Sequence, residues 1–396
     1  MTGSGTFTPG TGTVTFDGTG AQNITSLAGT TQPFYSLQNS NTGNTVTVVD
    51  KLEISAGGTL TIDASATLAL AGNEFNDNTG TVTNNGILTM DGDNTFTSTA
   101  LTIGGTGTTK FTDASGATLS TGIAGLADVE FNSSGNTFSL SEDMNYISGD
   151  ITITNGTLSM LGFDITLADA KTLTNSGTWS APTGTSSQFT CAGAAIFVGN
   201  DMNFYDFYAV PGAAKTIIFA DARTYTVANL LTLTGTSGNE LTLTNTGGTT
   251  AILDNTGDNH SVDYVKVDDV NATAGHKITA TNSLSIGGVT TNWIFTIVHF
   301  ISSATGSWND VNHWDQNRVP DSADDVEINH DMTLDINSNI RNLTVNSAKT
   351  LTFGAGKTLS ASGSVTVISG GTITINDGTL TAGGNSDING TVTLST

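Results

Sequence analysis

Short runs that alternate an apolar residue with a hydroxyl-bearing or small residue recur along nearly the whole chain. Residues 59–62, 151–154 and 372–375 each show this pattern. Successive side chains of a β-strand point to opposite faces, so such a run puts one set into a core and the other into water. Clusters of glycine and asparagine between the runs supply the positive φ angles that tight turns need. The pattern predicts many short strands joined by tight turns.

The spacing of these runs favours a solenoid over a sandwich. Apolar segments at 52–54, 59–62 and 67–70 follow one another with only short gaps, without the longer polar loops that Greek-key crossovers need. We therefore predict an all-β fold, a parallel β-helix or β-solenoid with short Gly/Asn turns. Coils of roughly 20 residues, stacked about 4.8 Å apart, would give a rod on the order of 90 Å long.

A loose internal repeat and a boundary divide the chain. Phe16 and Phe34 open a series of strands whose order returns at Phe189 and Phe204, which suggests a duplication of about 1–188 and 189–300. An aromatic stretch at 291–300 then leads to a Ser/Gly-rich hinge and to new alternating strands. We expect one β-solenoid over 1–300 and the start of a second over 301–396.

Charge and cysteine content exclude several classes of protein. The 396 residues include 11 Lys or Arg and 35 Asp or Glu, for a net charge of −24. Such a surface repels phosphate, which excludes nucleic acid as a partner. No run approaches the roughly 18 apolar residues of a membrane helix, so no membrane insertion is expected. The lone Cys191 excludes an intrachain disulfide.

The two ends of the sequence bear on its location. Residues 1–5 lack the basic and apolar regions of a signal peptide, and residues 391–396 stop inside a strand-like pattern. We expect the chain to be a piece of a longer protein whose export and anchoring signals lie elsewhere. High threonine, asparagine and glycine with almost no cysteine favours an extracellular or cell-surface location.

Three stretches resemble segments of large, repetitive bacterial surface proteins: residues 6–24, residues 259–295, and residues 306–328 with Trp308, Trp314 and Pro320. In overall style the chain is similar to filamentous-haemagglutinin-type adhesins and autotransporter passengers. The resemblance implies a right-handed β-helix at the cell exterior. It implies no catalytic residues.

Calcium is the metal that the sequence favours, although the fold requires no cofactor. Calcium takes six to eight oxygen ligands, often from carboxylates in turns. The best-placed carboxylates belong to Asp254, Asp258, Asp321, Asp324 and Asp325. None lies in a complete EF-hand pattern, and the simpler alternative is that acidic turns keep a polar rod soluble. The five scattered histidines do not form a zinc motif.

The tryptophans near the boundary allow two interpretations. Trp293, Trp308 and Trp314 lie close together in the sequence. The favoured interpretation is that they cap an open solenoid end, which would otherwise expose the core. The alternative is that Trp308 and Trp314 stack against sugar rings.

Threonine pairs suggest a further possibility. Pairs such as Thr59/Thr61, Thr350/Thr352 and Thr391/Thr393 place two hydroxyls on one strand face. Stacked in register, such pairs resemble the ice-binding face of some antifreeze solenoids. The unequal sequence spacing between pairs argues against one ordered array, and threonine as a good exposed strand former is the simpler explanation.

An enzyme is disfavoured. A polysaccharide lyase or hydrolase on a β-helix needs paired carboxylates or a basic residue beside them. The only arginines, Arg223, Arg318 and Arg341, lie in no carboxylate-rich strand pattern. We therefore expect a non-enzymatic extracellular structural protein, the rod of an adhesin or of a self-assembling filament, which associates end to end or binds surface glycans. A glycan-binding adhesin module is the first alternative, and a polysaccharide-processing enzyme the second.

Overall fold

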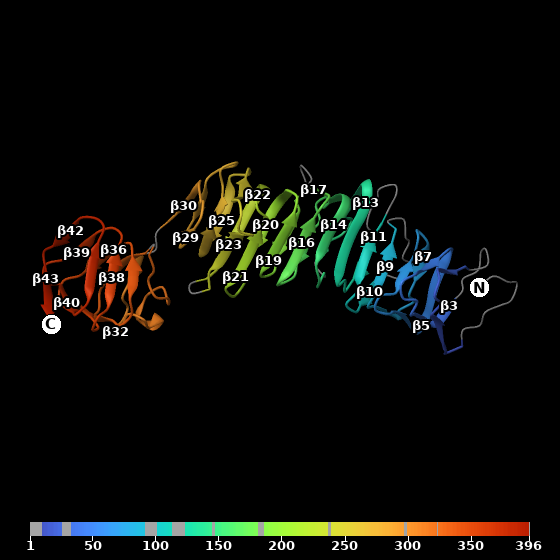
Figure 1. The fold of residues 1–396 in the computed structure, drawn as a ribbon, viewed down its shortest axis with the longest axis horizontal. Helices are drawn as coiled ribbons and strands as arrows, with labels where there is room; N and C mark the ends of the chain where they lie inside the picture. The colour runs from blue at the N-terminus through green and yellow to red at the C-terminus, as the bar shows by residue number, and fades with distance from the viewer. Residues whose placement is uncertain are drawn as a thin grey trace.

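The protein is an all-β solenoid of about 16 turns, which confirms the predicted fold class. The computed structural model describes residues 10–25, 33–91, 101–112, 123–144, 147–180, 186–236, 239–296, 299–322 and 324–395. Its coils follow one another along a rod, with the two termini at opposite ends (Figure 1). Among the described residues, no helix is long and apolar enough to cross a membrane. The implied right-handedness stays a prediction.

Strands of successive coils pair in parallel and stack into ladders. We call residues 10–296 the first module. One of its ladders contains β1 (Thr13–Phe16), β3 (Pro33–Asn39), β5 (Lys51–Ile62), β8 (Thr81–Asn84), β10 (Leu101–Gly104) and β12 (Ile123–Ala124), with β7 (Glu74–Asn76) paired to β5.

The other strands of the first module form ladders that long, bent strands join around the corners of the coil. They are β2 (Gln22–Ile24), β4 (Thr45–Val48), β6 (Thr67–Ala69), β9 (Ile87–Met90), β11 (Thr108–Phe111), β13 (Asp128–Ser139), β14 (Ile151–Ser159), β15 (Ile165–Leu167), β16 (Lys171–Asn175), β17 (Thr178–Ser180), β18 (Gln188–Cys191), β19 (Ala195–Gly199), β20 (Met202–Ala209), β21 (Lys215–Phe219), β22 (Thr224–Thr234), β23 (Leu241–Asn245), β24 (Ala251–Asn255), β25 (Asn259–Asp263), β26 (Val265–Asp268), β27 (Val270–Asn271) and β29 (Leu284–Gly287). A last pair contains β28 (Ile278–Ala280) and β30 (Trp293–Phe295).

Residues 299–395, which we call the second module, form three ladders. The first contains β31 (His299–Ile301), β33 (Asp325–Ile328), β36 (Asn342–Val345), β39 (Val365–Val367) and β42 (Ser386–Ile388). The second contains β32 (Gly306–Ser307), β34 (Met332–Leu334), β37 (Thr350–Phe353), β40 (Thr372–Asn376) and β43 (Thr391–Ser395). The third contains β35 (Ser338–Ile340), β38 (Thr358–Ala361) and β41 (Thr379–Ala382). A 3-10 helix, η1 (Val311–His313), lies in the first coil.

The coils differ in length around the roughly 20 residues that the sequence predicts. Thr59 pairs with Thr81 and Ile151 with Leu173, 22 residues apart, whereas Asp325 pairs with Asn342, 17 residues apart. Turns of different length account for the differences. With about 16 turns, the stacked coils span on the order of 80 Å.

Long strands bend where glycine permits it. The first part of β14 pairs with β16, and its last part pairs with β17. Gly156 lies between these parts with a φ of +84°, and a Cβ atom there would lie 2.2 Å from the carbonyl oxygen of Ser133. A side chain is therefore excluded at this corner.

We expect Gly199→Ala to lower the free energy of unfolding by about 2 kcal/mol, because left-handed backbone strain and a steric clash add. Gly199 has a φ of +97°, and its Cβ would lie 2.1 Å from the carbonyl oxygen of Asn175. Gly212, which has open space around its Cβ position, provides the control. Urea denaturation followed by circular dichroism measures both variants. Equal midpoints for Gly199→Ala and Gly212→Ala would contradict the prediction.

Aromatic side chains fill the middle of the first module. We call this cluster the aromatic stack; it consists of Trp179, Phe189, Phe197, Phe204, Phe207, Phe219 and Tyr225, all buried. Phe197 and Phe219 come from neighbouring coils and lie parallel, with ring centroids 5.5 Å apart. Trp179 meets Phe189 edge to face at 5.3 Å. Buried residues on both sides of position 188, such as Trp179 and Phe189, belong to one core. The proposed duplication of about 1–188 and 189–300 stays a prediction.

Many acidic residues bind backbone amides of the next coil. Asp128 Oδ1 accepts from Asp150 N at 2.9 Å, and Asp150 Oδ1 accepts in turn from Thr172 N at 2.8 Å. The same cross-coil bond forms between Asp143 and Asp164 N, Asp164 and Gln188 N, Asp169 and Ala194 N, Asp201 and Thr224 N, Asp206 and Leu230 N, and Asp331 and Thr350 N. These carboxylates satisfy amides at the turns, so the acidity also has a structural role.

Asp269 provides a pH-dependent test of these bonds. Its carboxylate accepts from Val289 N at 3.0 Å, Thr250 Oγ1 at 2.8 Å and Asn245 Nδ2 at 3.2 Å. These hydrogen bonds, of which that from Val289 N contributes most, hold the pKa of Asp269 below its ordinary value of 3.8. A lowered folded-state pKa contributes stability above the unfolded-state value, and this contribution is lost as the pH falls through the folded-state pKa.

We therefore expect Asp269→Asn to be less stable than the wild type at pH 7 and to approach it as the pH falls through the lowered folded-state pKa of Asp269. Urea midpoints between pH 7 and 2.5 measure this difference. The exposed Asp17, changed to Asn, makes the same change in net charge and provides the control. A stability difference that did not vary with pH would show that the charge of Asp269 has no role.

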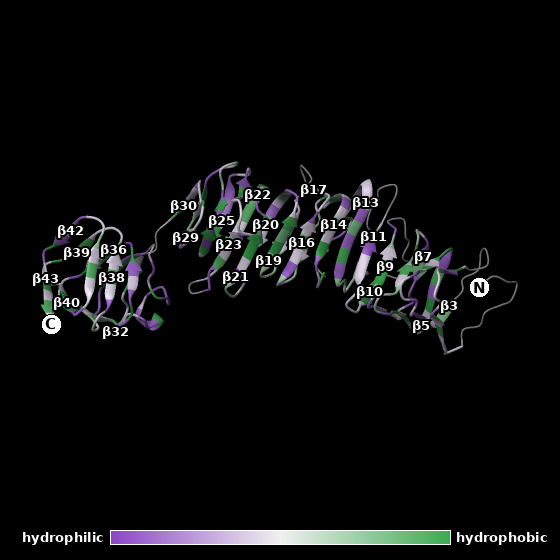
Figure 2. Cartoon of the chain, in the orientation of Figure 1, coloured by the Kyte–Doolittle hydropathy of each residue, from purple (hydrophilic) through white to green (hydrophobic). Residues whose placement is uncertain are grey.

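The buried side chains form two separate clusters. The first ends at Trp293, and the second begins at Phe300. The boundary that the sequence suggests near residue 300 lies between them. Figure 2 shows apolar and polar residues alternating along the strands of both modules. This is expected of β-sheets that bury one face in the core and expose the other to water.

Candidate functional site

Asp254 and Asp258, two of the predicted calcium ligands, have protein partners. Asp254 Oδ2 accepts from Thr226 Oγ1 at 3.3 Å. Asp258 Oδ1 lies 3.5 Å from His276 Nδ1. No group of three or more His, Cys, Asp or Glu side chains that could hold a metal gathers anywhere in the described residues. Calcium binding therefore stays a prediction.

Asp321, Asp324 and Asp325 lie beside arginines. Arg318 donates to both oxygens of Asp324, at 2.8 and 2.7 Å, and to Asp321 Oδ2 at 3.2 Å. Arg341 makes two bonds to Asp325. A guanidinium that already neutralises a carboxylate competes with a cation for its oxygens, so these residues are arranged as ion pairs.

Trp308 and Trp314 lie in the core of the second module. Their side chains are 0% and 1% exposed. The rings meet edge to face with centroids 4.9 Å apart, and Trp314 Nε1 donates to the carbonyl oxygen of Trp308 at 2.8 Å. Sugar stacking needs an exposed ring face, which neither indole offers in this structure. Their position in the first coil fits the capping interpretation, as does Trp293 near the end of the first module.

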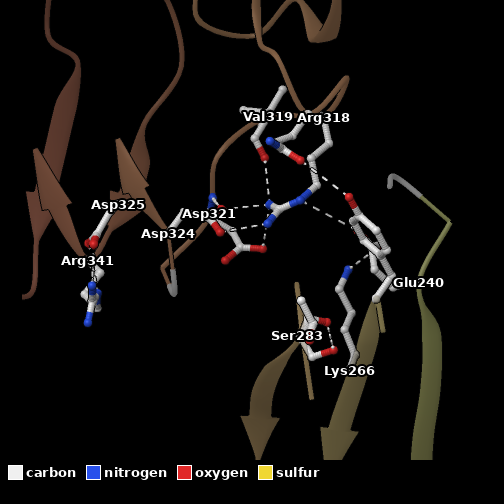
Figure 3. A network of polar contacts seen from close by, with 12 residues as sticks. Glu240, Lys266, Ser283, Arg318, Val319, Asp321, Asp324, Asp325 and Arg341 are labelled. Atoms are coloured by element: carbon white, nitrogen blue, oxygen red, sulfur yellow. Dashed lines mark hydrogen bonds and ion pairs between the residues drawn. The ribbon is translucent and has the colours of Figure 1, made fainter. Parts of the chain in front are cut away.

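Polar residues of both modules meet at the junction. We call this group the junction cluster; it consists of Glu240, Tyr264, Lys266, Gln316, Arg318, Asp321 and Asp324. Arg318 lies between Asp321 and Asp324 on one side and Glu240 with Lys266 on the other (Figure 3). Arg318 Nε is 3.9 Å from Glu240 Oε1, and Tyr264 Oη donates to Gln316 Oε1 at 3.4 Å.

The loop after η1 fixes the position of Arg318. Asp324 N donates to Asp321 O at 3.1 Å, and Asp321 N donates to Asp324 Oδ2 at 2.7 Å, so the two aspartates close a tight turn. The guanidinium lies over the ring of Phe300, 4.3 Å from its centroid, in a cation–π contact. Five contacts from its own module, including one to the carbonyl oxygen of Val319, therefore hold this side chain.

Burial raises the pKa of Asp324 to about 6, although the bonds from Arg318 act in the opposite direction. The folded-state value lies above the ordinary 3.8. Asp324 therefore contributes stability that is fully present below the unfolded-state pKa and is lost as the pH rises through about 6. The carboxyl is buried and charged at neutral pH, which makes it dependent on Arg318.

Sequence reasoning named Arg318 but did not pair it with Asp321 and Asp324, because it looked for arginines only within carboxylate-rich strands. Arg318 and both of its aspartates lie in a loop, and Glu240 is 78 positions earlier in the chain. The spacing of Arg318 to Asp321 and Asp324, three and six residues, was the local signal that could have indicated the ion pairs.

Threonine hydroxyls form an ordered array on one sheet of the second module, contrary to the expectation from sequence spacing. One column takes one residue from each of the strands β32, β34, β37, β40 and β43. In this order, its members are Ser307, Thr333, Thr352, Thr374 and Thr393. A second column contains Thr350, Thr372 and Thr391. We call these two columns the hydroxyl ladder. Turns of different length absorb the unequal spacing, so the strands themselves stay in register.

The chain matches nothing in three comparisons. Neither the protein-family models, nor the curated proteins, nor the solved structures include a match to it.

Proposed function

We propose that this chain is a non-enzymatic structural protein, the rod of a bacterial extracellular filament or adhesin stalk. The observation that carries the proposal is the parallel stacking of about 16 coils, arranged in two modules. Within each module, each coil hydrogen-bonds to its neighbours and buries its apolar side chains against theirs, so stability accumulates with length. The hydroxyl-rich, acidic exterior supports an extracellular or cell-surface location, because it keeps long rods soluble and apart.

The last described coil supports association between ends. Its strands β41, β42 and β43 each pair with the preceding coil on one side. Ile388, Val392 and Leu394 follow the register of buried core residues, yet they are exposed, Leu394 to 76%. A further β-solenoid coil would cover these side chains and pair with the strand edges. In a filament we propose that a second copy supplies this coil, whereas in a stalk segment the next coil of a longer chain would supply it.

Negative-stain electron microscopy of the purified chain, with and without calcium, tests the proposal. Long uniform fibres would support the filament, and isolated rods on the order of 80 Å would support a stalk segment. Round particles would contradict a rod of either kind. Leu394→Lys, which places a charge on the exposed end, should abolish fibres, whereas Thr366→Lys on the side of the rod should not. Fibres that appear only with calcium would support the predicted calcium sites.

The hydroxyl ladder favours a second candidate function, binding to the ordered water of an ice surface. The residues of one column lie about 4.8 Å apart along the rod, and the two columns lie about 6.6 Å apart along each strand. The array is regular in register, because none of its strand pairings carries a register shift. A rigid repeating surface suits a repeating ligand, and the threonines present both hydroxyl and methyl groups.

Non-colligative freezing-point depression tests this candidate. We expect the wild type to show thermal hysteresis, and Thr374→Tyr to lose it by disrupting the array. Thr366→Tyr, which lies on β39 in another ladder of the same module, provides the matched control. Absence of hysteresis in the wild type would rule the candidate out.

A further inference from the structure

The two modules have separate cores and touch through polar side chains. The cores end and begin at Trp293 and Phe300. Within the described residues, every strand pairing that involves a strand of the second module stays inside that module. A solenoid with continuous pairing resists bending, because bending would break backbone hydrogen bonds. This junction has no such ladder across it, so its rigidity depends on side chains.

Two polar contacts join the modules at the junction cluster, and both are long. Tyr264 Oη lies 3.4 Å from Gln316 Oε1, and Arg318 Nε lies 3.9 Å from Glu240 Oε1. Good hydrogen bonds of these types are about 2.7–3.0 Å long. The Nε–H of Arg318 has no hydrogen-bond partner within the described chain. It is therefore a buried donor for which Glu240 is the nearest carboxylate of the other module.

Each member of the ion pair across the junction also has a counter-ion in its own module. Arg318 has Asp324 and Asp321, and Glu240 has Lys266 with an N–O distance of 3.3 Å. Arg318 and Glu240 are each only 8% exposed. Separating a buried ion pair is usually costly because it leaves a charge alone. Here each charge keeps a counter-ion of its own module when the modules separate, so opening the junction leaves neither charge alone.

We propose that the junction is a hinge, and that the Arg318–Glu240 ion pair is the latch that holds it closed. The rod then has two rigid segments and one joint that bends. Breaking the latch changes the angle between the modules without unfolding either of them. The inference concerns the shape of the molecule and does not depend on the filament or stalk function.

Spin-label distance measurements test the hinge. The native Cys191 is buried, and its burial raises the pKa of the thiol, so it will not compete for the label. Labels on Val198→Cys and Thr333→Cys report the distance between the two modules. We expect the background protein to show one main distance, with a minor population at others. Glu240→Gln should lower the ratio of closed to open molecules by about fivefold or more.

Asp325→Asn is the matched control. It also turns a carboxylate into an amide and breaks an ion pair with arginine, but Arg341 and Asp325 lie in the same module. We expect its distance distribution to equal that of the background protein. Tyr264→Phe, which removes the second contact, should widen the distribution further when combined with Glu240→Gln. The melting temperature of the second module should stay unchanged in Glu240→Gln, which separates hinge opening from unfolding of that module.

Two results would overturn the proposal. One is a single narrow distance in Glu240→Gln identical to that of the background protein, which would mean a rigid joint. The other is an equal change in Asp325→Asn, which would mean that general loss of charge moves the modules.

Discussion

Phe197→Ala is expected to lower the free energy of unfolding of the first module by about 4 kcal/mol. Phe197 is fully buried and contacts Phe189, Phe204, Phe207, Phe219 and Tyr225, all within 6.3 Å between ring centroids. Truncation removes a large apolar side chain and leaves a cavity between coils. Stacked coils cannot close around it, because backbone hydrogen bonds fix the distance between them.

Val198 provides the control for this prediction. It is the next residue on β19 but points outward and is 41% exposed. Val198→Ala should cost well under about 1 kcal/mol. Urea denaturation followed by circular dichroism measures both variants. A cost for Phe197→Ala no greater than that for Val198→Ala would mean that the aromatic stack is not the packed core of the rod.

Asp324→Ala is expected to destabilise the second module by about 3 kcal/mol or more at pH 7.5, because it leaves Arg318 buried without its bidentate partner. The cost should be larger at pH 5. The pKa of Asp324 is about 6 in the folded protein, so the wild type gains stability as the pH falls through that value, and the variant does not. Hydrogen exchange of peptides from β33 and β36 measures the effect in this module.

Two further variants separate the ion pair from general effects. Asp321→Ala removes a more exposed partner of the same guanidinium and should cost less than about 1 kcal/mol. Arg318→Met combined with Asp324→Leu should cost less than Asp324→Ala alone, because neither charge then remains buried. A double variant at least as unstable as Asp324→Ala alone would contradict this prediction, because removing the stranded charge of Arg318 would then have recovered no stability.

The hydroxyl ladder shows where sequence reasoning reached its limit. Thr350/Thr352 and Thr391/Thr393 are visible as pairs, but their separation along the chain does not reveal that they share a face. Whether residues of different coils align depends on how much chain each turn holds. Only the strand pairing in the structure shows how much chain each turn holds. For this reason the unequal sequence spacing of the threonine pairs wrongly argued against an ordered array.

Trp308 and Trp314 show a different limit of sequence reasoning, because their residue type allowed two interpretations. An indole serves equally well as a core cap or as a sugar platform, and the burial of both rings fits the cap. The acidic residues behave similarly. Asp324 and Asp325 have the carboxylates that calcium needs, but Arg318 and Arg341 are their partners in the folded chain.

The sequence by itself determined the class of fold, because side chains of a strand alternate between two faces and glycine and asparagine permit the turns between strands. Residues such as Leu60 and Ile62 must then face a core, and the structure buries both. Only the tertiary structure decided which residues of different coils meet. The contacts of Arg318 with Glu240 and of Thr352 with Thr374 join positions whose neighbourhood depends on coil length and on the junction of two modules. No local sequence pattern encodes coil length or the place of the junction, because both depend on all the turns that lie between the residues that meet.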